Sequence, residues 1–166
     1  MVGKKKIALL LCGLLSASLL VGCGGETENE KETSKKKVGI IQLIQHDALD
    51  QANKGFIDGL AEKGYKDGEN IEIEQQNASG KQDTAQQIAG QFVSAKKDLI
   101  FAIATPTAQA CYNATKDIPI VFSAVTDPVK DGLAKDLKSS GCNTTGTSDM
   151  ANIDEQLALL KEGLPD

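Results

Sequence analysis

The sequence lacks arginine and tryptophan and contains a single histidine, His46. Without arginine, no guanidinium group can grip a carboxylate or phosphate with two parallel hydrogen bonds. An anionic ligand would therefore need lysine, hydroxyl groups or the N-terminus of a helix. One histidine also argues against a zinc site, which is usually built from several histidine and cysteine ligands. We expect neither a metal nor a cofactor.

Sequence signatures of catalysis and of nucleotide binding are missing as well. The chain has no G-x-S-x-G nucleophile turn, no GxGxxG run and no P-loop. Its 18 lysines face 23 acidic residues, and such an acidic balance does not favour nucleic acid as a partner. These absences favour a binding protein over an enzyme.

The first 23 residues have the layout of a bacterial lipoprotein signal peptide. Three lysines at positions 4–6 precede an apolar run at 7–21, and the stretch Leu-Val-Gly-Cys at 20–23 matches the lipobox. The apolar run is shorter than the roughly 20 residues that a membrane-spanning helix needs. We predict a signal peptide at residues 1–22, cleavage before Cys23 and lipid attachment to its thiol, which places the protein on the outer face of the cell membrane. An uncleaved N-terminal anchor is the alternative.

The mature chain divides into a short tether and one domain. Residues 23–37 carry charged and small polar groups but no large apolar side chain, which predicts a disordered tether after the lipidated cysteine. Residues 38–166 have the length of a single domain. Two cysteines remain in this part, Cys111 and Cys142. A disulfide is permitted outside the cytoplasm, although two buried free thiols are the favoured interpretation.

From Val38 onward, the hydrophobic pattern alternates between strand-like and helix-like segments. Strands are expected at 38–44, 70–75, 98–104 and 118–123, with a short edge strand within 141–147. Helices are expected at 47–63 with Asp47 as N-cap, 85–93, 105–115 with Thr105 as N-cap, 133–138, and 153–164 after a capping box. This alternation predicts an α/β fold, a three-layer Rossmann-like parallel sheet with helices on both faces.

Polar residues follow four of the predicted strands. In open α/β sheets, ligands bind beyond the carboxyl ends of the strands. The candidate ligand-binding residues are His46, Ser79, Thr105, Thr107, Ser123 and Asp127.

Thr105 to Thr107 form the strongest candidate, because a helix N-terminus with two hydroxyl groups suits a carboxylate; simple helix capping is the alternative. Asp127 suits a ligand ammonium group, although aspartate before proline is also a common turn former. His46 and Ser79 are equally compatible with ordinary loop residues.

Several long runs resemble a known family. The segments VGIIQLIQHDALDQANKGFIDGLAEKGY, ATPTAQA and IPIVFSAVTDPV are similar to the ABC-transporter substrate-binding lipoproteins of the tryptophan/tyrosine type, and the likeness extends from residue 38 to about 165. The resemblance implies a type I periplasmic-binding-protein fold with two lobes around a cleft. It implies a small solute, expected to be tryptophan, tyrosine or phenylalanine, and delivery to ABC permease subunits. The six candidate residues would line the cleft face of the first lobe.

Members of that family continue into a second lobe, whereas this sequence stops at Asp166. We therefore expect residues 38–166 to be an N-terminal lobe alone, truncated or partial, with weak ligand binding. A membrane-tethered ligand sensor on the same scaffold and a non-functional single-lobe fragment are the alternatives.

Overall fold

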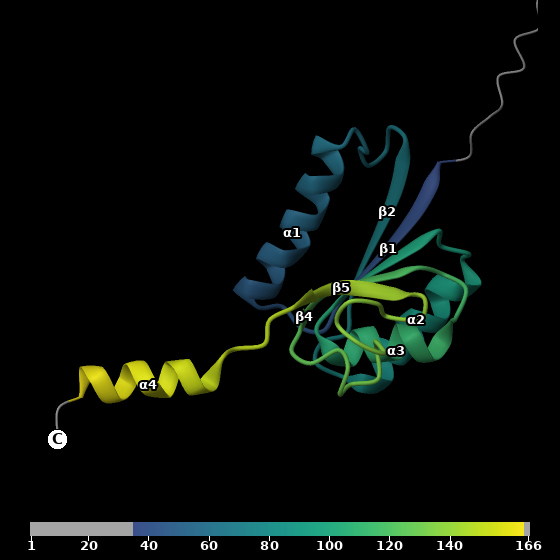
Figure 1. Ribbon diagram of the computed structural model, residues 1–166. Coiled ribbons are helices and arrows are strands. Elements are labelled where there is room, and N and C mark those ends of the chain that lie inside the picture. Colours follow the sequence, from purple (N-terminus) through teal and green to yellow (C-terminus); the bar gives the residue numbers. More distant parts are fainter. Residues whose placement is uncertain (1–34, 165–166) are drawn as a thin grey trace, which may run out of the picture. The chain divides into compact units, whose positions relative to one another are not determined.

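The computed structural model describes residues 35–164 and contains one parallel sheet of five strands in the order β2-β1-β3-β4-β5 (Figure 1). Its strands are β1 (Lys36–Gln42), β2 (Ile71–Asn77), β3 (Leu99–Ile103), β4 (Ile120–Val125) and β5 (Thr144–Ser148). Neighbouring strands pair in parallel throughout. The predicted signal peptide, the lipidation site Cys23 and nearly all of the predicted tether lie outside the described residues.

Helices cover both faces of this sheet. They are α1 (Asp47–Glu62), α2 (Gln82–Ser94) and α3 (Thr105–Ala114), followed by α4 (Ile153–Gly163) after the last strand. In Figure 1, α1 lies on one face of the sheet, and α2 and α3 lie together on the other. The predicted three-layer α/β architecture is confirmed.

The larger core lies between the sheet and the pair α2 and α3. Phe92 of α2 is fully buried there against strand residues such as Ile41 and Ile100. Gly39 of β1 makes room for this helix, because a Cβ atom at that position would come within 2.7 Å of the Phe92 ring. The glycine in an otherwise apolar strand is thus explained by close helix packing.

The core on the α1 face is smaller. Phe56 of α1 stacks on Phe101 of β3 with their ring centroids 4.0 Å apart. No residue of α1 is fully buried. This helix therefore covers its face of the sheet more loosely than α2 and α3 cover theirs.

Several predicted boundaries are wrong. Strand β1 starts at Lys36, inside the predicted tether, because Asp98 holds this end: it pairs with Lys36 at 2.7 Å and accepts a hydrogen bond from the backbone N–H of Lys37 at 2.8 Å. The N-caps are His46 rather than Asp47 and Ala104 rather than Thr105.

The helix predicted at 133–138 is also wrong, because that segment forms turns and bends. Leu133 is fully buried, and Gly132 before it has a φ of +73°. The segment is held by this buried side chain and by backbone hydrogen bonds to Pro128 and Ser140 rather than by a helical face.

Helix α4 begins as predicted, with the Asn152 Oδ1 atom accepting a hydrogen bond from the backbone N–H of Glu155 at 3.4 Å. Its predicted apolar stripe is present, but each large side chain of that stripe is more than half exposed: Ile153, Leu157, Leu160 and Leu164. Across residues 35–164, no helix has the length and apolar character to cross a membrane.

Candidate functional site

The carboxyl ends of strands β1 to β4 meet at one edge of the parallel sheet. We call the four segments at and just beyond these strand ends, residues 43–47, 77–80, 104–107 and 123–127, the rim. Backbone hydrogen bonds join neighbouring segments. The N–H of Gly80 donates to the carbonyl of Leu43 at 2.7 Å, and the N–H of Ala104 donates to the carbonyl of Ser123 at 2.9 Å. All six predicted site residues therefore belong to one edge of the sheet.

His46 is exposed and caps α1. Its Nδ1 atom accepts a hydrogen bond from the backbone N–H of Ala48 at 3.2 Å, and its carbonyl accepts one from the N–H of Asp50 at 2.8 Å. The imidazole therefore carries its proton on Nε2 when neutral, which leaves a donor directed away from the helix.

Ser79 follows β2 with a φ of +52°, which is unusual for a residue other than glycine. Its backbone N–H donates to the Oδ1 atom of Asn77 at 2.8 Å. Ser79 is exposed and lines an open hollow with Ile44, Gln45 and Asn77. This places it beside residues of the segment that follows β1.

Thr105 and Thr107 stand at the start of α3, but the structure gives them different environments. Thr105 is half-buried. Thr107 is fully buried, and its hydroxyl group lies 2.8 Å from the carbonyl oxygens of both Ile103 and Ala104. The Thr107 hydroxyl is therefore used inside the fold, and only the backbone of this residue contributes to the helix N-terminus.

Ser123 and Asp127 lie at the end of β4. Both are half-buried, and the Ser123 hydroxyl accepts a hydrogen bond from the Thr147 hydroxyl of β5 at 3.4 Å. The Oδ1 atom of Asp127 accepts a hydrogen bond from the backbone N–H of Lys130 at 3.0 Å. Asp127 thus stabilises a turn, which is the role expected from the sequence as the alternative to ligand binding.

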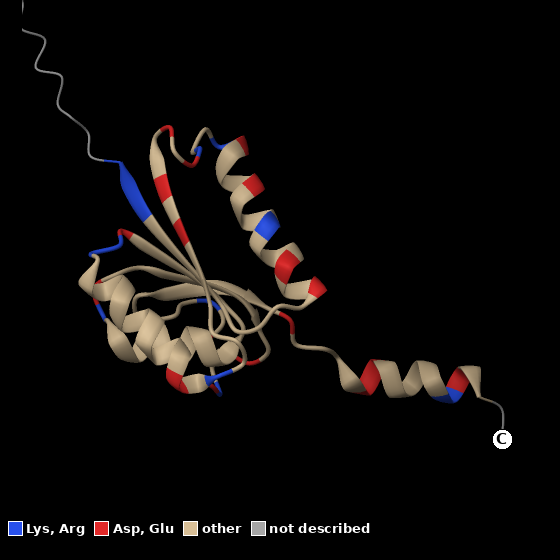
Figure 2. Ribbon diagram, turned by 180° about the vertical axis from the view of Figure 1, so that it is seen from behind, with Lys and Arg blue, Asp and Glu red and all other residues tan. Residues whose placement is uncertain are grey.

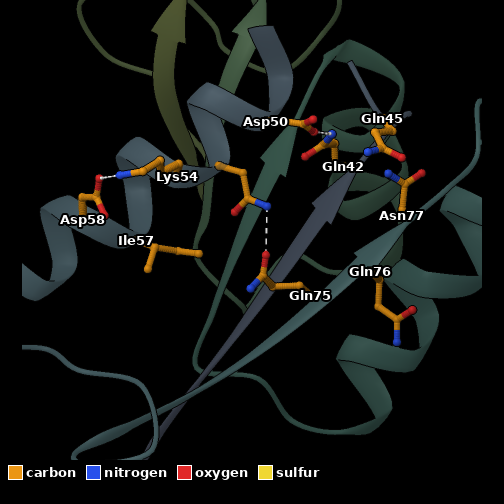
Figure 3. Close-up of a pocket in the computed structure, with 10 residues that line it drawn as sticks. Gln42, Gln45, Asp50, Lys54, Ile57, Asp58, Gln75, Gln76 and Asn77 are labelled. Carbon is orange, nitrogen blue, oxygen red and sulfur yellow. Dashed lines mark hydrogen bonds and ion pairs between the residues drawn. The ribbon is translucent and has the colours of Figure 1, made fainter. Parts of the chain in front are cut away.

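A second hollow, with a volume of about 480 Å³, lies between α1 and β2 next to the rim (Figure 3). We call it the α1–β2 hollow. Nine of its ten lining residues are polar or charged: Gln42, Gln45, Asp50, Asn53, Lys54, Asp58, Gln75, Gln76 and Asn77, with Ile57 as the tenth. Gln45 and Asn77 also line the hollow at Ser79, so the two cavities adjoin.

Hydrogen bonds order the walls of the α1–β2 hollow. The Gln42 amide donates to the Oδ1 atom of Asp50 at 2.6 Å, and the Asn53 amide donates to the Oε1 atom of Gln75 at 2.9 Å. Gln42 is not among the six site residues predicted from the sequence. The sequence does contain one indication of its role: it is the single amide in the apolar run that forms β1, and a buried amide needs a hydrogen-bonding partner.

The charge around these cavities is mostly negative. Acidic positions predominate along α1 and β2 (Figure 2), and α1 carries Asp47, Asp50, Asp58 and Glu62. Within residues 35–164, no group of three or more histidine, cysteine, aspartate or glutamate side chains is placed to hold a metal ion. The site consists of hydroxyl, amide and carboxylate groups around a helix N-terminus, which suits the binding of a polar solute.

Comparison with known proteins gives consistent matches. Residues 37–166 match the family model described as ABC transporter substrate binding protein. The chain is 53% identical over 170 residues to a tyrosine-binding protein of Clostridioides difficile (strain R20291), a match that covers 98% of this chain and 49% of that protein. The chain therefore spans about half the length of this curated relative.

Solved structures agree with this match. One is a ligand-free, open substrate-binding protein with adhesive properties from Clostridium difficile, with 56% identity and a TM-score of 0.73 over 76% of this chain and 43% of that one. Another is an ABC domain in complex with L-Trp from Streptococcus pneumonia, with 43% identity and a TM-score of 0.73 over 77% of this chain and 43% of that one. On the family match over residues 37–166, this chain belongs to the ABC transporter substrate-binding protein family.

Proposed function

We propose that this chain forms the first lobe of the solute-binding component of an ABC importer. The observation that carries the proposal is the rim, where four parallel strands bring polar residues to one edge of the sheet, in a chain of this family. Ligands of open α/β sheets bind at this edge. In the complete binding protein, a second lobe would close on the rim and bury the solute from both sides.

The proposed solute is an aromatic amino acid, namely tyrosine, tryptophan or phenylalanine. Support comes from two relatives, one named as a tyrosine-binding protein and one solved in complex with L-Trp. The second lobe would supply the other half of the pocket. We assign the aromatic side chain of the solute to that lobe, because the rim of this lobe is lined by polar groups. The rim of this lobe would receive the polar end of the solute.

Each end of an amino acid has a suitable partner at the rim. The solute carboxylate would accept hydrogen bonds from the Thr105 hydroxyl and from backbone N–H groups of the first turn of α3, including that of Thr107, because a helix N-terminus attracts negative charge. The solute ammonium group would pair with Asp127 and with the hydroxyl of Ser123. His46 and Ser79 would border the site from the segments that follow β1 and β2.

We further propose that residues 1–22 are removed, that Cys23 carries a lipid, and that residues 24–35 connect this anchor to the folded lobe, which begins with β1 at Lys36. The N-terminal sequence supports this arrangement through its lysines, its apolar run and its lipobox. A lipid-anchored lobe outside the cytoplasm would meet permease subunits at the membrane surface.

Calorimetry on the complete binding protein tests the proposed function. Tyrosine, tryptophan and phenylalanine are titrated into the wild type and into Thr105→Val, with Thr145→Val on the edge strand β5 as the matched control. We expect saturable binding by the wild type, a loss of roughly tenfold in affinity for Thr105→Val, and no change for Thr145→Val. Absence of heat with all three amino acids would refute the aromatic solute, and an unchanged affinity of Thr105→Val would remove its role.

A further inference from the structure

We propose that the hydrogen bond between Gln42 and Asp50 positions the β1–α1 loop, residues 43–46, for ligand capture at the rim. Gln42 is then a positioning residue that acts through the loop and the start of α1. This inference rests on the proposed function. It extends that function by giving a role to Gln42, a buried side chain that does not need to contact the ligand.

Gln42 is the last residue of β1 and is only 5% exposed. Its amide Nε2 atom donates to the Oδ1 atom of Asp50 at 2.6 Å and to the carbonyl of Ile44 at 2.8 Å. One amide group therefore holds both the loop, through Ile44, and the first turn of α1, through Asp50 (Figure 3 shows the contact with Asp50). Because the amide is buried, losing either partner would leave a polar group without compensation.

The strand gives Gln42 a fixed position. β1 is paired on both sides, with Gln42 opposite Asn77 of β2 and Ile103 of β3. The loop beyond it is exposed at Ile44, Gln45 and His46. A strand end that is paired on both sides and that bonds to an exposed loop and to the start of a helix is the arrangement expected of a positioning contact, since it transmits the geometry of the sheet to the rim.

The chemistry of the pair is specific, because an amide donates to a carboxylate. In Gln42→Glu, two carboxylates would face each other across the same short distance and repel each other when both are ionised. At neutral pH the pair would separate, whereas in mild acid a shared proton would restore one hydrogen bond. The other charged groups that line the hollow, Lys54 and Asp58, pair with each other.

The test measures the affinity of the complete binding protein for L-tyrosine and L-tryptophan, at neutral pH and at about pH 5. We expect Gln42→Glu to weaken binding roughly tenfold at neutral pH, equivalent to about 1.4 kcal/mol, and to recover in acid. Gln42→Glu combined with Asp50→Asn exchanges donor and acceptor at the bond to α1, but it leaves the Ile44 carbonyl without its donor, so the neutral-pH affinity should recover in part. Gln51→Glu adds the same charge at an exposed position of the first turn of α1 and should bind like the wild type.

Unchanged affinity in Gln42→Glu, or a double variant as weak as the single one, would overturn the proposal. If Gln42→Glu does not fold, Asp50→Ala replaces it, and wild-type affinity in that variant would equally overturn it. If the wild type binds neither amino acid, the solute assignment fails by itself. The positioning role is then decided by amide hydrogen exchange of residues 43–48, which Gln42→Glu should accelerate and the double variant should slow again in part. Exchange in Gln42→Glu as slow as in the wild type would refute the role.

Discussion

The two cysteines of the described chain have opposite environments. Burial raises the pKa of the Cys111 thiol to about 12. Cys142 is exposed at the residue level. Partial burial of its sulfur raises its pKa, but hydrogen bonds from Thr144, Ser140 and Tyr112 outweigh this and lower the pKa below its usual value. The structure has both as free thiols, as expected from the sequence, but the expectation that both are buried is wrong for the exposed Cys142.

Thiol labelling should therefore distinguish them. We expect iodoacetamide at mildly alkaline pH to modify Cys142 much faster than Cys111, because the thiolate is the reactive form and only Cys142 is both accessible and shifted toward it. Mass spectrometry of the two peptides measures the ratio. The Cys142→Ser variant gives the labelling rate of Cys111 alone. Comparable labelling of Cys111 and Cys142 in the folded protein would contradict a buried Cys111 and an exposed Cys142.

Gly39 offers a test of packing at one atom. In Gly39→Ala the new Cβ atom would lie 2.7 Å from the Phe92 ring, so we expect the free energy of unfolding to fall by about 1–3 kcal/mol. Gly90→Ala is the control, because nothing lies within 4 Å of its Cβ position in the exposed part of α2. That change should raise stability by about 0.5–1 kcal/mol. Urea denaturation measures the free energy of unfolding of both variants. An equal change in the two would mean that α2 does not approach β1 so closely.

At the scale of elements, the junction between β3 and α3 stores backbone strain beside the site. Ala104 has φ 86° and ψ 151°, a region that is essentially restricted to glycine. It is held there because its N–H bonds to the carbonyl of Ser123, and its own carbonyl accepts a hydrogen bond from the Thr107 hydroxyl. The rim geometry at Thr105 thus depends on contacts within the segment 104–107 and on its bond to the segment 123–127.

Relief of this strain should be measurable. We expect Ala104→Gly to raise the free energy of unfolding by about 1 kcal/mol, since glycine adopts this conformation without a steric cost. Ala102→Gly, in the buried middle of β3, should lower stability instead, because it loosens a strand and removes a packed methyl group. Thermal or urea unfolding compares the two, and destabilisation by Ala104→Gly would argue against the strained backbone.

The same junction shows which features of an element can be predicted. The apolar runs located β1, β3 and β4, because burial on both faces of a parallel sheet demands continuous apolar sequence. An alternating pattern located β2, and β5 was expected only as a short edge strand within 141–147. The boundaries of the helices and strands were harder to predict: the side chain that caps α1 belongs to His46 rather than Asp47. Capping depends on the direction in which the chain leaves the previous strand, and the local sequence does not encode that direction.

At the scale of the whole domain, an ion pair between a buried lysine and a partly exposed carboxylate ties β2 to the segment that leads into β3. The Nζ atom of Lys97 lies 2.6 Å from the Oε2 atom of Glu74, and the Lys97 side chain is 3% exposed while that of Glu74 is 39% exposed. The hydrogen bond from Lys97 lowers the pKa of Glu74, with a further contribution from Gln76. Because the pKa is lower in the folded state, the pair stabilises the fold above the pKa of an unperturbed glutamate and loses this effect as pH falls through the folded value.

Glu74→Gln should therefore destabilise the domain at neutral pH and flatten the loss of stability in acid. We expect a cost of about 1–2 kcal/mol, below that of a fully buried pair because solvent screens the exposed carboxylate. Glu72→Gln, at an exposed position of the same strand, should follow the wild-type curve. Urea midpoints measured from neutral pH to about pH 3 decide the matter. Parallel curves for Glu74→Gln and the wild type would show that the pair contributes no pH dependence.

The sequence by itself determined the fold class, the order of elements and the edge at which polar residues gather, because these follow from hydrophobic periodicity and from the geometry of parallel strands. Family membership was also visible in the sequence and is confirmed by the match over residues 37–166. Only the tertiary structure decided which side chains of that edge are available. In the folded domain, the Thr107 hydroxyl bonds to a backbone carbonyl in the interior and the Gln42 amide bonds to Asp50. These outcomes depend on the packing of segments distant in the chain, since a hydroxyl or amide bonds to whichever partner the fold places within about 3 Å.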